Sequence, residues 1–78
     1  MAFFKFRALN AKTGKQIKAE IYLGGIRRGF TQDKRGACLI VETSQTGSFS
    51  WYAIYGGRKI DSGNSPGGSI DIIYSENN

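Results

Sequence analysis

Side chains that catalyse reactions or hold metal ions are sparse in this sequence of 78 residues. It contains no histidine and one cysteine, Cys38, which excludes the common zinc sites, the Ser-His-Asp triad and the Cys-His pair. Asp61 and Asp71 fall on different expected strands, so only folding would bring them together as paired carboxylates. No glycine-rich phosphate loop precedes a helical segment. We therefore expect no enzyme activity, no cofactor and no bound metal.

Four basic side chains flank one expected hairpin, residues 26–37, and suit an anionic ligand. They are Arg27, Arg28, Lys34 and Arg35. In an antiparallel pair of strands they would gather at the hairpin ends, where they could grip phosphates or carboxylates. The alternative is that these charges keep the hairpin soluble and protect a sheet edge from pairing.

Two tyrosines on different expected strands suggest a second kind of binding contact, made by exposed aromatic rings. We expect Tyr22 and Tyr52 on the outer faces of their strands, where tyrosine suits contact with a protein or a glycan. Together with Phe3 and Phe30 they are also the candidates for base stacking, should the ligand be a nucleic acid. Trp51 alternates onto the apolar side of its strand, which indicates a place in the core.

The net charge of +5 is unevenly distributed along the chain. Residues 1–36 hold nine basic and two acidic side chains, whereas residues 37–78 hold two basic and four acidic ones. The asymmetry would support head-to-tail contacts between copies or contacts with a larger partner. A solvated surface without a ligand is the alternative.

A period of two dominates the hydrophobic pattern, most clearly in residues 16–23. There Ile17, Ala19, Ile21 and Leu23 point one way and polar side chains point the other, as in a half-buried strand. Glycine at position 29 predicts a bulge or an edge. The other expected strands are 3–9, 26–32, 37–42, 48–55, 58–61 and 70–74. The apolar run 37–42 predicts a central strand buried on both faces, and the composition of 62–69 predicts a loop.

Seven short strands at intervals of roughly ten residues, without helical periodicity, predict an all-β fold. We expect one domain over residues 1–78, a small antiparallel β-sandwich. A single cysteine cannot form an internal disulfide, so packing alone must hold the fold. No signal peptide and no apolar segment of the ~20 residues that span a bilayer are present. The protein is therefore expected in the cytoplasm by default, or outside the cell if a leader was removed, and without membrane insertion.

Three motifs occur in an order that suggests a family. Residues 14–23 combine a glycine turn with an alternating strand, Thr31, Asp33 and Gly36 form a polar turn, and Gly47 precedes the aromatic strand. In this order the chain resembles the carboxypeptidase regulatory-like domains, which are transthyretin-like (prealbumin-type) β-sandwiches. The resemblance implies a non-catalytic module that supports a neighbouring enzyme or acts as an assembly or adhesion unit.

The functional expectation is a non-enzymatic binding or assembly module that contacts another protein or itself. One alternative is an anion-binding or nucleic-acid-binding domain that uses Arg27, Arg28, Lys34 and Arg35. A weaker alternative is a glycan-binding module that uses Tyr22 and Tyr52.

Overall fold

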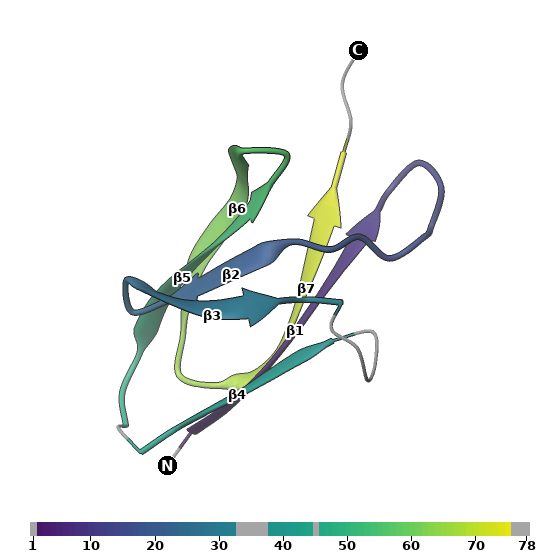
Figure 1. Ribbon diagram of the computed structural model, residues 1–78. Coiled ribbons are helices and arrows are strands. Elements are labelled where there is room, and N and C mark those ends of the chain that lie inside the picture. Colours follow the sequence, from purple (N-terminus) through teal and green to yellow (C-terminus); the bar gives the residue numbers. More distant parts are fainter. Residues whose placement is uncertain (1, 33–37, 45, 76–78) are drawn as a thin grey trace.

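The computed structural model describes residues 2–32, 38–44 and 46–75. Over these residues the chain forms seven β-strands and no helix, and therefore contains no helix that could cross a membrane. The strands are β1 (Ala2–Asn10), β2 (Glu20–Leu23), β3 (Ile26–Phe30), β4 (Leu39–Thr43), β5 (Phe49–Tyr55), β6 (Arg58–Ser65) and β7 (Gly68–Tyr74). They form two sheets, ordered β4-β1-β7 and β3-β2-β5-β6 (Figure 1). The predicted all-β fold of seven strands in a small sandwich is confirmed.

Strand pairing is antiparallel, as expected, with one exception. β1 and β7 lie side by side in parallel, in register from Phe4 opposite Gly68 to Asn10 opposite Tyr74. Parallel pairing joins segments far apart in sequence, and here it joins the first strand to the last. The chain consequently enters β1 and leaves β7 at opposite ends of the sandwich (Figure 1).

The core is built from the inner faces of the two sheets, as the alternation predicts. Phe4, Phe6 and Ala8 of β1 are fully buried. They meet the aromatic strand β5, where the ring centroid of Trp51 lies 5.8 Å from that of Phe6 in an edge-on arrangement. Such edge-to-face pairs add to the stabilisation from area burial. The buried side chains predicted for residues 16–23 are confirmed, including Ile17 and Leu23.

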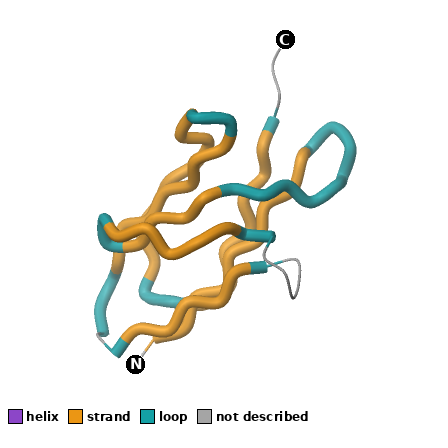
Figure 2. The backbone as a smooth tube through the Cα atoms, viewed as in Figure 1, coloured by secondary structure: helices purple, strands orange, loops and turns teal. Residues whose placement is uncertain are grey.

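Regular pairing of β2 is shorter than predicted, because residues 11–19 form a loop. Its first part projects from one end of the sandwich (Figure 2), whereas Ile17 and Ala19 in its second part are buried. In this loop the buried side chain of Thr31 makes hydrogen bonds to the backbone that a paired strand would otherwise provide. Its hydroxyl donates a hydrogen bond to the carbonyl of Ile17 at 2.8 Å and accepts one from the amide of Ala19 at 3.0 Å. The bulge predicted from Gly29 is present, since the register of β2 and β3 shifts beside it.

The prediction that residues 37–42 form a central strand buried on both faces is wrong. β4 begins at Leu39 and lies at the edge of the three-stranded sheet, with β1 in the centre. Its side chains alternate between buried and exposed, and Ile40 is 65% exposed. An apolar run identifies a strand but does not distinguish burial on two faces from an exposed apolar face. Cys38 precedes the strand and is half-buried.

The prediction that residues 62–69 form a loop is also wrong. β6 continues to Ser65 and β7 begins at Gly68, so that only Pro66 and Gly67 connect them. Glycine and serine are depleted in strands because they offer little to pack. Packing explains the glycine at position 63, since a Cβ atom there would lie 3.1 Å from the indole of Trp51.

Candidate functional site

Two tyrosines form the centre of the outer face of the four-stranded sheet. Tyr22 of β2 and Tyr52 of β5 are direct cross-strand partners. Their rings stack with centroids 4.7 Å apart and planes 9° from parallel. The prediction that both lie outside the core is confirmed, since each is half-buried on the face opposite Trp51. Strand alternation alone accounts for this placement.

Cationic side chains lie on the aromatic rings of the same face. The ammonium of Lys18 lies 4.9 Å and the guanidinium carbon of Arg27 lies 5.1 Å from the ring centroid of Phe30. The ammonium of Lys59 lies 5.7 Å from the centroid of Tyr52. These distances fall within the range of cation–π attraction. We call this surface the aromatic–cationic face: Tyr22, Phe30 and Tyr52, with Lys18, Arg27 and Lys59 on them.

One carboxylate interrupts the positive charge of the aromatic–cationic face. Glu20 accepts a close hydrogen bond from Nε of Arg27, and the two form an ion pair at the surface. Partial burial raises the pKa of the Tyr22 phenol above its ordinary value, and the nearby carboxylate of Glu20 adds to this rise. A hydrogen bond to Glu20 contributes to the same rise in pKa, so the one proton of the Tyr22 phenol is already engaged within this face.

The structure describes two of the four predicted basic site residues, Arg27 and Arg28. Arg27 lies on the aromatic–cationic face, whereas Arg28 lies at the bulge of β3. Both border a shallow depression of about 550 Å³ along the free edge of β3, together with Phe30 and Leu39. Arg28 makes no ion pair with any residue that the structure describes. Lys34 and Arg35 lie outside the described residues.

Two cations of this site were not among the predicted site residues. Lys18 alternates with Ala19 and thus shares the side of Glu20 and Tyr22, a signal that was present in the sequence. Lys59 could not be found in this way, because its position beside Tyr52 depends on the register of β5 with β6. That register shifts between Ala53 and Ile54.

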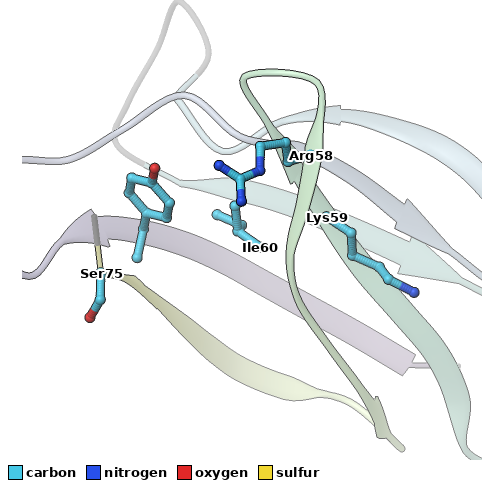
Figure 3. Close-up of a pocket in the computed structure, with 5 residues that line it drawn as sticks. Arg58, Lys59, Ile60 and Ser75 are labelled. Carbon is cyan, nitrogen blue, oxygen red and sulfur yellow. The ribbon is translucent and has the colours of Figure 1, made fainter. Parts of the chain in front are cut away.

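A separate pocket of about 210 Å³ lies where β6 begins and β7 ends, lined by Arg58, Lys59, Ile60, Tyr74 and Ser75. Figure 3 shows the side chain of Arg58 on the side of Ile60, whereas that of Lys59 points away to the other side of the strand. The side chains of Arg58 and Lys59 therefore lie on different sides of β6. Only Lys59 contributes to the aromatic–cationic face.

The aromatic–cationic face is suited to binding at a surface. It combines aromatic rings with cationic groups and has no enclosed cavity. Across residues 2–32, 38–44 and 46–75, no three His, Cys, Asp or Glu side chains gather as a metal site would require. Asp61 and Asp71 belong to different sheets, and Asp71 pairs with Arg7 at 3.1 Å.

The chain was also compared with known proteins. No protein-family model, no curated protein and no solved structure matches it. The relation to transthyretin-like domains therefore remains a prediction, and the functional conclusions below depend on the geometry of this chain.

Proposed function

We propose that this protein is a non-enzymatic binding module that recognises an acidic segment of another protein. The observation that carries the proposal is the aromatic–cationic face, where three cations lie on aromatic rings of one exposed sheet surface. Tyrosine and arginine are enriched in protein interfaces, and tyrosine buries a large area at small entropic cost.

The charge of the face favours an acidic ligand. Among the described residues of this face, Lys18, Arg27 and Lys59 are opposed by one carboxylate, that of Glu20. The chain as a whole carries +5, which steers an acidic partner toward it over distances of about the Debye length. Carboxylates of the partner would complement the ammonium groups of Lys18 and Lys59.

The arrangement of the rings favours a protein over a nucleic acid or a glycan. Base stacking and sugar stacking both require an aromatic ring with an open flat face. Tyr22 and Tyr52 stack on each other, and the faces of Tyr52 and Phe30 carry cations. At least one face of each ring is therefore already occupied, which disfavours stacking of a base or a sugar and favours a polypeptide.

Titration of the ¹⁵N-labelled protein with two defined polyanions tests the proposal. The probes are a poly-glutamate peptide and oligothymidylate, followed by chemical shift changes. We expect poly-glutamate to shift resonances of Tyr22, Tyr52 and Lys59 at moderate salt. A flat response to poly-glutamate would contradict the proposal, and tighter binding of oligothymidylate on the same residues would favour the nucleic-acid alternative.

A matched pair of variants locates the binding surface. Lys18→Glu/Lys59→Glu reverses two lysines of the aromatic–cationic face, and Lys12→Glu/Lys15→Glu reverses two exposed lysines of the β1–β2 loop. Both variants change the net charge equally. The first should abolish poly-glutamate binding, whereas the second should weaken it by only a few fold through long-range charge. Equal losses in the two variants would show that net charge alone attracts the peptide.

A further inference from the structure

The outer face of the three-stranded sheet is exposed and apolar at both ends. Among the described residues four large hydrophobic side chains are exposed, and three of them lie on this face: Phe3 at 56%, Ile40 at 65% and Ile73 at 53%. Exposed hydrophobic residues scattered singly are ordinary, but a gathering on one sheet face indicates an interaction surface. This surface lies on the sheet opposite to the aromatic–cationic face.

The register of the sheet shows how the apolar side chains are arranged. Phe3 and Ile40 lie near one end of β1, in adjacent rows, and border a depression of about 300 Å³. Leu9 and Ile73 are direct neighbours near the other end. The outer face thus has an apolar cluster at each end of β1, separated by a polar belt.

Charges in and beside the belt cancel each other. Lys5 and Arg7 supply two positive charges on the outer face, and Glu42 and Asp71 supply two negative ones. Arg7 and Asp71 form an ion pair at 3.1 Å across β1 and β7. In a chain of net charge +5, the described side chains of this face sum to zero, so two copies of the face can approach without net repulsion between them.

We propose that this face binds a second copy of the chain, face to face, about a two-fold axis through the polar belt. A two-fold axis that lies in the interface and crosses β1 at the belt reverses the direction of β1 and places the Phe3 end of one copy over the Leu9 end of the other. The same operation brings Lys5 of one copy to the Arg7–Asp71 ion pair of its partner. Such an isologous contact is self-complementary and closes at the dimer.

The size of the face sets the expected affinity. A strand of nine residues is about 30 Å long, and three strands are about 15 Å wide. This outline is about 450 Å² per copy and about 900 Å² for the pair, which is less than the 1,200 Å² or so that specific interfaces bury in total. The dimer should therefore be weak and populated at micromolar to millimolar concentration.

Sedimentation velocity over a concentration series tests the proposal. The wild-type protein should shift from monomer to dimer with no larger species, and high salt should leave the dimer intact because its surface is neutral and apolar. A monomer at every concentration would overturn the proposal. Larger species that salt dissolves would overturn it in favour of head-to-tail contacts between the basic and acidic halves.

Three isoleucine variants locate the interface. Ile40→Lys and Ile73→Lys each introduce a charge at one end of the face, and Ile26→Lys makes the same change at a position that is 57% exposed but belongs to β3. The first two should weaken dimerisation about tenfold or more, because a two-fold contact contains each change twice. Ile26→Lys should dimerise like the wild type. An equal effect of all three would overturn the assignment of the face.

A second set of variants keeps every apolar side chain and guards against misfolding. Asp71→Lys gives the face a net charge of +2 and should weaken the dimer, whereas the exchange Arg7→Asp/Asp71→Arg keeps it neutral and should restore it. Circular dichroism confirms that each variant is folded. Dimerisation that is indifferent to Asp71→Lys would contradict the charged belt as part of the contact.

Discussion

Thr31 is the one fully buried polar side chain among the described residues, and its role is structural. Its hydroxyl connects the amide of Ala19 to the carbonyl of Ile17, where the pairing of β2 with β3 has ended. The backbone amide of Thr31 also donates to the carbonyl of Ala19 at 2.8 Å. One side chain thus satisfies backbone groups that a buried loop would otherwise leave without partners.

Thr31→Val should destabilise the fold by about 2–4 kcal/mol, because it retains the shape but leaves a buried amide and a buried carbonyl unsatisfied. Thr31→Ser keeps the hydroxyl and loses one methyl group, so it should cost only about 1 kcal/mol. Urea unfolding followed by Trp51 fluorescence measures both. If Thr31→Ser is as destabilising as Thr31→Val, the methyl group rather than the hydrogen bonds stabilises this loop.

The phenol of Tyr22, on the aromatic–cationic face, makes the stability of the fold depend on pH. Partial burial and the carboxylate of Glu20 raise the pKa of its phenol in the folded state. The folded chain therefore holds this proton more tightly than the unfolded chain, whose tyrosines titrate near pH 10. The stabilisation is complete below about pH 10 and is lost as the pH rises through the folded-state pKa.

The Tyr22→Phe variant should therefore lose less stability than the wild type when the pH is raised above about 10. Urea unfolding on both sides of that pH measures the difference, and the absorbance of tyrosinate follows the titration directly. Tyr74→Phe is the control, since it removes a phenol from the other sheet and leaves Tyr22 beside Glu20. A pH dependence that Tyr22→Phe leaves unchanged would contradict this assignment.

At the scale of the element, β6 is a strand because of its partner and not because of its own composition. Arg58–Ser65 contains one large apolar residue, Ile60, and pairs along the length of β5. The strand accepts the indole of Trp51 over Gly63, whose inner face carries no side chain. Tertiary pairing thus overrides an unfavourable local propensity.

Gly63→Ala should destabilise the protein by about 1–3 kcal/mol, because the added Cβ would lie 3.1 Å from the Trp51 ring and force the packed core to shift. Thermal unfolding gives the loss of stability, and a change in Trp51 fluorescence reports the displaced indole. Ser62→Ala is the control on the neighbouring, exposed position of the same strand. A loss as large in Ser62→Ala would place the effect in strand propensity instead of packing.

Alternation in the sequence was sufficient for the elements whose two faces differ. It placed Ile17, Ile21 and Trp51 inside and Tyr22 outside. The alternation argument failed where an apolar side chain is exposed, as at Ile40 of β4. The parallel pairing of β1 with β7 and the register that brings Lys59 to Tyr52 are non-local, and no pattern within a single strand encodes them.

For the molecule as a whole, the two outer faces of the sandwich have different character. The four-stranded sheet presents cations on aromatic rings, whereas the three-stranded sheet presents a neutral face with apolar ends. We propose that the first binds a partner and the second binds another copy. Because the faces lie on opposite sheets, both contacts can form at once, which would let one dimer engage two acidic segments and gain avidity.

The parallel contact between the first and last strands also determines how the molecule bears force. Tension applied to the two ends of the chain pulls β1 and β7 along their length in opposite directions, so the seven register pairs from Phe4–Gly68 to Asn10–Tyr74 are loaded together (Figure 1). We expect a high unfolding force in single-molecule pulling from the two ends. Pulling from the N-terminus and a Pro66→Cys attachment, in a Cys38→Ser background, loads the pairs one after another from the Gly68 end and should require a clearly lower force. Equal forces in the two geometries would mean that the β1–β7 ladder does not resist tension, and that the barrier to forced unfolding lies in another part of the sandwich.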